Sequence, residues 1–227
     1  MMAAFRLRLA DLPPEFAIFP LTDALLLPGG QLPLNIFEPR YLAMIEDTLA
    51  ASRMLAIIQP DRARTDGPTG PALYRVGCLG RLTSFSEMDD GRYLITLTGI
   101  ARFRVAEEVA MRRGYRRVRA DYTGFEADLA PAEEGTGFDR ANLLQVLRAY
   151  FVRRGIDANW DAIYQMPDET LVTTLAMVCP FDPVEKQALL ESANPADRFA
   201  TLLTLLHIDG HDDADGEDGV ARRRRAT

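Results

Sequence analysis

The first part of the chain is a series of short apolar runs that proline and glycine interrupt. The run that starts at Ile18 is interrupted by Pro20, and the next run ends at Pro28-Gly29-Gly30, which predicts a turn. An extended stretch over residues 31–37, with Pro33 inside it, follows. Because proline cannot donate a ladder hydrogen bond and favours an extended residue before it, these prolines indicate strand ends, turns or a sheet edge.

Residues 39–50 are predicted to form a helix. Pro39 suits the first helical turn, where its missing N–H costs nothing. Apolar side chains then recur at helical spacing and make one apolar face, which consists of Tyr41, Leu42, Ile45 and Leu49.

Strand signals continue up to residue 125. The predicted strands cover residues 54–59, 76–88, 93–98 with a continuation to 105 after Gly99, and 115–125, and a polar loop covers residues 61–72. Gly77 and Gly80 indicate a bulge, and Asp89-Asp90-Gly91 predicts a hairpin turn because Asp-Gly readily supplies a positive φ. We therefore expect residues 14–125 to form a β-rich barrel or half-barrel that carries one helix.

The second part of the chain reads as helical. Residues 126–138 are acidic and rich in breakers, which predicts a linker, and residues 139–208 predict a bundle of about four helices. The predicted helix starts lie at Asp139, Asp168, Asp182-Pro183 and Asn194-Pro195. Residues 209–227 contain almost no apolar residues and are expected to be a disordered tail. The predicted fold class is α+β.

An ordered set of short motifs resembles the N-terminal domain of Lon proteases. The set comprises Phe19-Pro20-Leu21, Leu27-Pro28-Gly29, Leu32-Pro33-Leu34, Ile36-Phe37-Glu38-Pro39-Arg40-Tyr41, Val76-Gly77-Cys78-Leu79-Gly80, Asp90-Gly91-Arg92-Tyr93 and Gly99-Ile100-Ala101-Arg102-Phe103-Arg104-Val105. The resemblance runs from about Phe16 to His207. It implies a PUA-like barrel and a role in substrate recognition, here as a stand-alone domain.

The composition is that of an ordinary soluble globular protein, with 48% hydrophobic residues, 26% charged residues and a net charge of −7. An acidic body argues against indiscriminate phosphate binding. Cys78 and Cys179 lie far apart in apolar contexts, which indicates two reduced, buried thiols rather than a disulfide framework. Because neither a signal peptide nor a membrane-spanning run is evident, we expect a cytoplasmic protein without a membrane partner.

Intact Lon proteins carry an ATPase module and a Ser-Lys peptidase, and the sequence lacks the motifs of both. It has no Gly-x-x-x-x-Gly-Lys-[Ser/Thr] loop to cradle phosphates. The only lysine, Lys186, has no nucleophile-like serine nearby and is expected to be a solvated helix residue. His207 and His211 are too few for a typical zinc site, and the aspartates of the tail do not match a calcium loop. We therefore expect no catalytic residue, no cofactor and no metal.

An arginine cluster is the best candidate for contact with nucleic acid. It consists of Arg112, Arg113, Arg116, Arg117 and Arg119, with Tyr115 among them. Arginines beside an aromatic ring can pair with phosphates and stack on bases, and several PUA-type folds bind RNA. The alternative is the solvated face of an edge strand, where charge discourages aggregation. The acidic body favours this structural interpretation.

The candidate contacts to polypeptide lie near the resemblance motifs. Leu25, Leu26 and Leu27 precede the Pro-Gly-Gly turn and are expected to leave an exposed apolar patch. Glu38 and Arg40 flank Pro39, either as peptide contacts or as charges that stabilise the helix terminus. The first hypothesis is a non-enzymatic module that binds unfolded or partner polypeptide, including a protease partner. The second is a PUA-like RNA-binding protein and the third an unrecognised hydrolase, and the sequence leaves the oligomeric state open.

Overall fold

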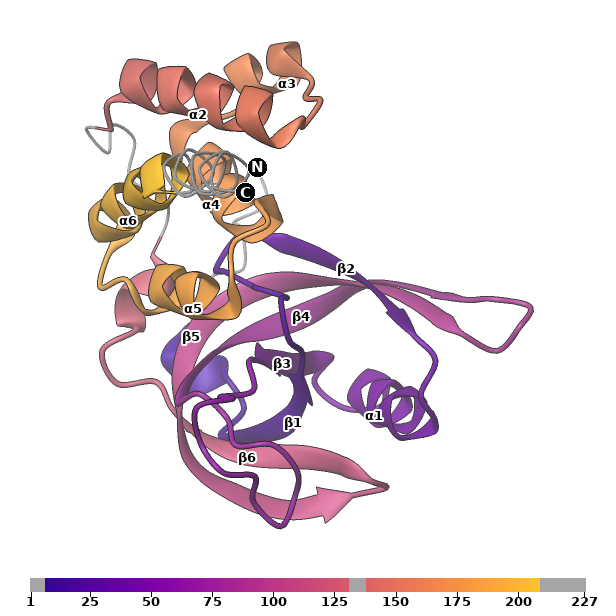
Figure 1. Cartoon of the computed structure of the whole chain (residues 1–227). Coiled ribbons are helices and arrows are strands. Elements are labelled where there is room, and N and C mark those ends of the chain that lie inside the picture. Colours follow the sequence, from indigo (N-terminus) through magenta and orange to yellow (C-terminus); the bar gives the residue numbers. More distant parts are fainter. Residues whose placement is uncertain (1–6, 131–137, 209–227) are drawn as a thin grey trace, which may run out of the picture. The chain divides into compact units, whose positions relative to one another are not determined.

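The computed structural model describes residues 7–130 and 138–208 of the 227-residue chain. Strands occupy its first part and helices its second part, which confirms the predicted α+β class (Figure 1). The elements in chain order are η1 (Leu9–Asp11), β1 (Glu15–Pro20), β2 (Gln31–Ile36), α1 (Pro39–Leu49), β3 (Met54–Ile58), β4 (Val76–Glu87), β5 (Tyr93–Arg112), β6 (Tyr115–Asp121), η2 (Glu126–Leu129), α2 (Arg140–Arg154), α3 (Trp160–Gln165), α4 (Asp168–Val178), α5 (Pro183–Glu191) and α6 (Pro195–Ile208).

The chain divides into two compact units. The β-rich unit comprises residues 1–132 together with Met177–Glu191, and the helical unit comprises residues 133–176 and 192–227. Helix α5 is thus grouped with the strands, although it follows three helices in the sequence. The domain boundary at residues 126–138 stays a prediction, and residues 131–137 lie outside the described part of the chain, as does the expected tail.

The six strands form one sheet in the order β2-β5-β4-β3-β1-β6. β6 also pairs with β5, so the five strands β5-β4-β3-β1-β6 close into a barrel, and β2 pairs with β5 outside this ring. β1 runs parallel to β3, and the other strand pairs are antiparallel. The expectation that the arginine-rich strand is an edge strand is wrong, because β6 pairs with β1 on one side and with β5 on the other.

The predicted hairpin between β4 and β5 is confirmed. Gly91 has φ 80°, and the N–H of Met88 donates to the carbonyl of Arg92 at 2.8 Å. The predicted bulge is also present, as a register shift between Leu79 and Gly80. Gly99 does not interrupt the strand, because β5 continues through it as a single strand of 20 residues.

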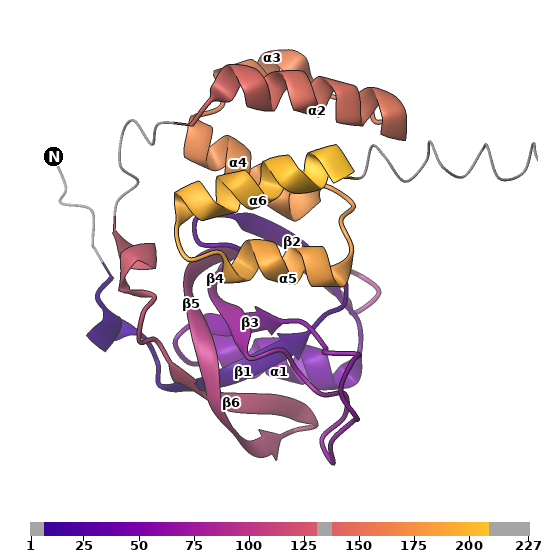
Figure 2. The ribbon, with the colours of Figure 1, turned by 60° about the vertical axis from the view of Figure 1, so that its left-hand side comes forward.

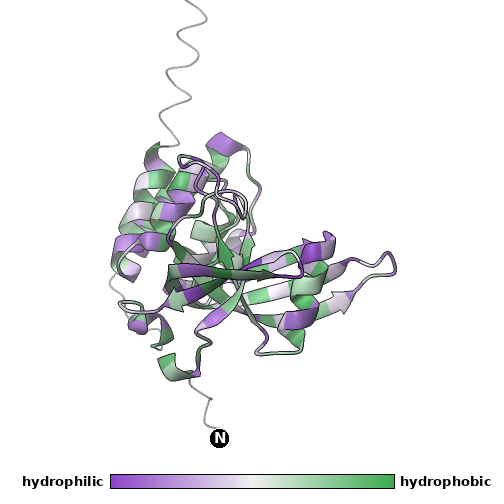
Figure 3. Cartoon of the chain, turned by 90° about the horizontal axis from the view of Figure 1, so that it is seen from below, coloured by the Kyte–Doolittle hydropathy of each residue, from purple (hydrophilic) through white to green (hydrophobic). Residues whose placement is uncertain are grey.

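A hydrophobic core fills the barrel. It is built from strand residues that include Phe16, Ile18, Leu79, Phe103 and Val118, all buried. The rings of Phe16 and Phe103 meet edge to face, with their centroids 5.0 Å apart. Figure 3 shows hydrophobic and hydrophilic residues alternating along the strands, as expected when one face of a strand is buried and the other is wet.

Two opposed glycines explain where the leucine run lies. Gly80 and Gly99 are register partners on β4 and β5. A Cβ atom at Gly80 would lie 2.8 Å from the side chain of Leu26, and one at Gly99 would lie 2.0 Å from the carbonyl oxygen of Leu27. Leu25, Leu26 and Leu27 are therefore buried against this notch. The expectation that they leave an exposed apolar patch is wrong.

Polar contacts hold α5 within the β-rich unit. The side-chain amide of Gln187 donates to the carbonyl of Val76 at 3.1 Å, and the guanidinium of Arg102 donates to the carbonyl of Leu190 at 3.1 Å. Lys186 is buried, and its ammonium donates to the carbonyl of Asp23 at 2.6 Å. The expectation of a solvated Lys186 is wrong, because α5 turns this side chain towards the loop that follows β1.

The helices of the helical unit begin and end largely where the sequence predicts. The carboxylate of Asp139 accepts from the N–H of Asn142, and Gly155 ends α2 with φ 61°. Asn194 accepts from the N–H of Asp197 at the start of α6. Asp168 is the first residue of α4 and pairs with Arg140. Figure 2 shows the ribbons of α2, α3, α4 and α6 in this unit.

Candidate functional site

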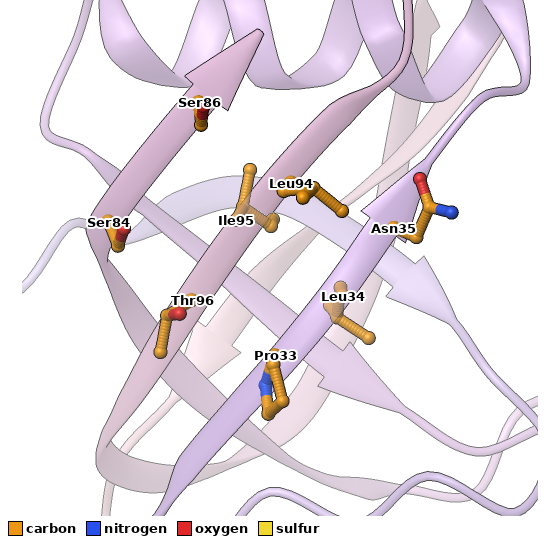
Figure 4. Close-up of a pocket in the computed structure, with 8 residues that line it drawn as sticks. All are labelled: Pro33, Leu34, Asn35, Ser84, Ser86, Leu94, Ile95 and Thr96. Carbon is orange, nitrogen blue, oxygen red and sulfur yellow. The ribbon is translucent and has the colours of Figure 1, made fainter. Parts of the chain in front are cut away.

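An open groove lies where β2, β5 and β4 run side by side, next to the β4–β5 hairpin. It has a volume of about 470 Å³. Figure 4 shows the residues that line it on the three neighbouring strands: Pro33, Leu34, Asn35, Ser84, Ser86, Leu94, Ile95 and Thr96. We call this lining the arm groove.

Strand register places six of the eight lining residues in two rows, and Leu34 and Ile95 occupy the alternate positions. The first row contains Ser84, Thr96 and Pro33, which are register partners on the three strands. The second row contains Ser86, Leu94 and Asn35. Directly opposed residues point to the same face of a sheet, so both rows line one face.

The opposite face of the same three strands is the packed one. Ile95 and Leu97 alternate with Leu94 and Thr96 along β5 and are buried, as is Ile36 on β2. Near the hairpin, Phe85 and Tyr93 meet edge to face with ring centroids 5.0 Å apart. β5 thus has one buried apolar face and one exposed groove face here, whereas Phe85 on β4, nearer the hairpin, is 39% exposed.

The arm groove contains no charged residue. Its lining consists of hydroxyls, one amide and apolar side chains, and Leu94 on its middle strand is 43% exposed. Phe37 directly follows β2 and is 64% exposed. In a chain with 26% charged residues, an uncharged concave surface with exposed leucine and phenylalanine is typical of a binding surface. Its side chains offer no nucleophile–base pair and no set of metal ligands.

The other predicted site residues lie outside this groove. The guanidinium of Arg40 pairs with the carboxylate of Glu38 at 2.8 Å, and both side chains are exposed. Glu38 precedes the first residue of α1, where a carboxylate is favourable. This pairing supports the structural interpretation of the two charges, and a contact to peptide stays a prediction.

The predicted arginine cluster is neutralised by neighbouring acids. Ion pairs join Arg112 to Asp47, Arg113 to Glu46 and Asp47, Arg116 to Glu108, Arg117 to Glu15, and Arg119 to Glu15 and Glu107. Arg116 is only 7% exposed and also donates to the carbonyl of Pro71 at 2.7 Å. Guanidinium groups held by carboxylates in this way are poorly placed to bind phosphates.

Tyr115, the aromatic residue of the cluster, is also engaged in contacts within the protein. Its hydroxyl donates to the carboxylate of Asp47 at 2.7 Å, and its side chain is buried. Burial, followed by the hydrogen bond to Asp47, raises the pKa of Tyr115 to about 12. The ring is therefore part of a clamp between α1 and β6 rather than a platform for a base.

The remaining candidates are two histidines and two cysteines. His207 lies in the last turn of α6, and His211 lies outside the described residues. Within residues 7–130 and 138–208, no group of three or more potential metal ligands occurs. Cys78 and Cys179 are both buried, as predicted. None of the helices described is long and apolar enough to cross a membrane.

Sequence reasoning missed the arm groove. The available signal was the stretch Gln31–Phe37, which contains no charged residue although Glu38 and Arg40 follow it immediately. Assigning its groove face required the register between β2 and β5, and also the shift in β4 between Leu82 and Ser84.

The fold and the groove define an α+β protein with a closed β-rich unit, a helical unit and one uncharged surface on three strands. The family model of the ATP-dependent protease La (LON) substrate-binding domain matches residues 15–207. The chain belongs to this family.

Lon proteases are among the curated relatives that match. Lon protease 2 of Myxococcus xanthus is 31% identical over 111 residues, which is 49% of this chain and 13% of that protein. Lon protease of Elusimicrobium minutum is 24% identical over 203 residues, which is 86% of this chain and 24% of that protein. The chain therefore spans a quarter or less of these two relatives.

Solved structures share the fold. The Lon N-terminal domain protein from Xanthomonas campestris matches with a TM-score of 0.55 and 22% identity, over 84% of this chain and 97% of that one. The N-terminal domain of Mycobacterium avium complex Lon protease matches with a TM-score of 0.59 and 17% identity, over 85% and 98%.

Proposed function

We propose that this protein is a non-catalytic module that binds unfolded polypeptide, with the arm groove as its binding surface. It acts in the cytoplasm as an adaptor, as a regulator or in a chaperone-like role, and a protease is one partner class. Membership of the Lon substrate-binding family supports recognition of polypeptide. The single observation that carries the choice of surface is the uncharged groove face with Leu94 exposed on its middle strand.

Two properties of the groove suit an unfolded chain. Apolar contact is non-directional and tolerates many sequences, which a binder of unfolded segments requires. The hydroxyls of Ser84, Ser86 and Thr96 can donate to or accept from the backbone of a bound segment. These features do not depend on ion pairs, so binding should survive added salt.

A charge in the groove tests the proposal. The probe is fluorescently labelled, reduced and carboxymethylated α-lactalbumin, which stays unfolded, and binding is followed by anisotropy. Leu94→Asp is expected to weaken binding about tenfold or more, because a bound apolar segment would bury an unpaired carboxylate. Met111→Asp is the matched control, since Met111 lies on the same strand and is 47% exposed but lies outside the groove.

The outcomes separate the proposal from its alternatives. Equal loss in both variants, or no binding by the wild type, contradicts the proposal. A labelled RNA hairpin serves as the second probe. Phosphate contacts weaken steeply as salt rises, so RNA binding that collapses with salt and with loss of Arg117 would establish the nucleic-acid alternative instead.

A further inference from the structure

β2 has a free edge. It is the terminal strand in the sheet order, and in the described part of the chain it pairs with β5 alone. A terminal strand presents a row of unpaired backbone groups, and these are a template for another extended chain. Natural edges are protected by charged side chains, by proline and by other devices; Gln31–Phe37 carries no charge and has the single proline Pro33.

The hydrogen-bond phase determines which backbone groups face outwards. The N–H of Gly99 donates to the carbonyl of Gly30 at 2.9 Å, immediately before the ladder starts. Because pairing alternates along an antiparallel ladder, Leu32, Leu34 and Ile36 exchange hydrogen bonds with β5. The backbone groups of the alternate residues, Gln31, Pro33 and Asn35, then point to the free edge.

The position of Pro33 agrees with this phase. Proline within a sheet is confined to edge strands, at positions where the missing N–H would face away from the ladder. The free edge therefore offers the carbonyls of Gln31, Pro33 and Asn35, but N–H groups only at Gln31 and Asn35. Their side chains belong to the same face as the arm groove, and Pro33 and Asn35 line it.

We propose that the arm groove takes its ligand by strand addition, with an extended, uncharged segment of unfolded polypeptide pairing to the free edge of β2. β2 spans six residues, which sets the length of the paired segment. Side chains opposite Gln31, Pro33 and Asn35 would lie beside the arm groove, and the alternate ones beside the apolar face of Leu32 and Leu34.

The charge pattern decides the chemistry of this segment. Neither β2 nor the groove provides a partner for a charged side chain, so burying one there would be costly. In folded proteins, uncharged segments in extended conformation usually occur as buried strands. Such a segment becomes accessible when the protein that contains it unfolds, and this inference rests on the proposed function.

Backbone methylation of a peptide tests strand addition directly. The probe is a labelled ten-residue peptide with a central run of alternating valine and threonine and a lysine at each end. A version with an N-methyl group on every second amide keeps one intact edge and should bind within about threefold of the parent. A version methylated on every amide has no donor and should lose about tenfold or more in affinity.

Protein variants test the edge itself. Pro33→Val supplies the missing outward N–H and should tighten binding about fivefold, whereas Asn35→Pro removes an outward N–H and should weaken binding by a similar factor. Pro180→Val is the control for a changed proline at an exposed site outside β2. Circular dichroism and elution volume verify that each variant keeps its fold and assembly state.

The results distinguish two failures. If all the peptides bind equally and neither β2 variant changes the affinity, strand addition is overturned while polypeptide binding stands. If neither the peptides nor carboxymethylated α-lactalbumin bind the wild type, the proposed function itself fails. Self-association that Asn35→Pro abolishes, without peptide binding, would assign the edge to a second copy of the chain and would also overturn the proposal.

Discussion

Gly99 is the position in the β-rich unit that leaves least room for a side chain. A Cβ atom there would lie 2.0 Å from the carbonyl oxygen of Leu27. Neither atom can turn away by a side-chain rotation, because the oxygen belongs to the backbone and the Cβ atom is bonded directly to it. We expect Gly99→Ala to lower the free energy of unfolding by about 2–3 kcal/mol, because the leucine run must move away from the strands. Urea unfolding followed by circular dichroism measures the change.

A second glycine provides the control for this prediction. At Gly67 the nearest atom to a new Cβ is the carbonyl oxygen of Gly70, at 3.9 Å. Gly67→Ala should therefore change the free energy of unfolding by less than about 0.5 kcal/mol. Similar effects at both positions would show that the notch at Gly99 does not fix the leucine run.

Residue-scale signals in the sequence divide into two kinds. Local ones were predictable: the caps at Asp139 and Asn194 and the turn at Gly91 depend on atoms within a few residues along the chain. The burial of Leu26 was not, because it depends on Gly80, which lies 54 residues further along and meets it only through the sheet. The hydrophobic pattern alone cannot distinguish an exposed leucine run from one that is buried because glycines on neighbouring strands leave room for it.

Among the contacts between elements, a buried ion pair of the β-rich unit also reaches α5. Arg102 and Asp128 pair at 2.8 Å, with their side chains 3% and 7% exposed, and the same guanidinium donates to the carbonyl of Leu190 in α5. Removing one partner leaves a buried charge unpaired. We expect Arg102→Ala and Asp128→Ala each to lower the free energy of unfolding by about 3–5 kcal/mol.

The double variant provides the control for this ion pair. Arg102→Met combined with Asp128→Leu removes both charges and keeps apolar volume, so it should destabilise less than either single alanine variant. Thermal unfolding of the three proteins compares them. If the double variant loses the sum of the two single effects, the cost arises from lost packing and not from an unpaired charge.

A second contact between elements joins α1 to β6 and responds to alkaline pH. The pKa of Tyr115 is raised from 10 to about 12, first by burial and then by its hydrogen bond to Asp47. Above pH 10 the unfolded chain therefore loses this proton before the folded chain does, and stability falls as pH rises towards 12. Tyr115→Phe lacks this proton and should not share that part of the decline.

The measurement is a comparison of wild type and Tyr115→Phe by urea unfolding. At about pH 8 the free energy of unfolding should be about 1–2 kcal/mol higher for the wild type than for Tyr115→Phe, because the variant lacks the hydrogen bond to the carboxylate of Asp47. The difference should narrow as pH rises to about 11. A difference that stays constant over this range would show that the hydroxyl titrates alike in both states.

The groove shows what element-scale prediction lacked. The strands β2, β4 and β5 were each predictable from pattern and turn residues, and so was the hairpin that joins two of them. The rows that join Pro33, Thr96 and Ser84 also need the register, which a bulge between Leu82 and Ser84 resets. A shift of one residue would exchange the groove face for the packed face.

At the scale of the whole molecule, two separate segments of the chain form the β-rich unit. The chain leaves that unit after residue 132, returns for Met177–Glu191 and leaves it again. The sequence predicted one boundary, because only residues 126–138 combine acidic and helix-breaking residues. Nothing in the pattern of α5 distinguishes it from the helices before and after it. A cut at the predicted linker would therefore separate α5 from its partners.

Those partners are buried polar groups of the barrel. Gln59 donates to the carbonyl of Pro183 and to the side chain of Gln187, both at 3.1 Å. Gln187 in turn donates to the carbonyl of Val76. Without α5 these groups lose their hydrogen bonds to it, and each such hydrogen bond contributes about 0.5–1.5 kcal/mol to stability.

We therefore expect a fragment of residues 1–132 to unfold at a clearly lower urea concentration than the same fragment joined to residues 177–191 through a flexible linker. The joined protein restores the hydrogen bonds of Gln59 and Gln187 at a high effective concentration. A joined protein that carries Gln187→Ala is the control, and it should fall between the two. Equal midpoints for all three proteins would mean that the strands fold without α5, and the boundary predicted at residues 126–138 would then separate two self-sufficient domains.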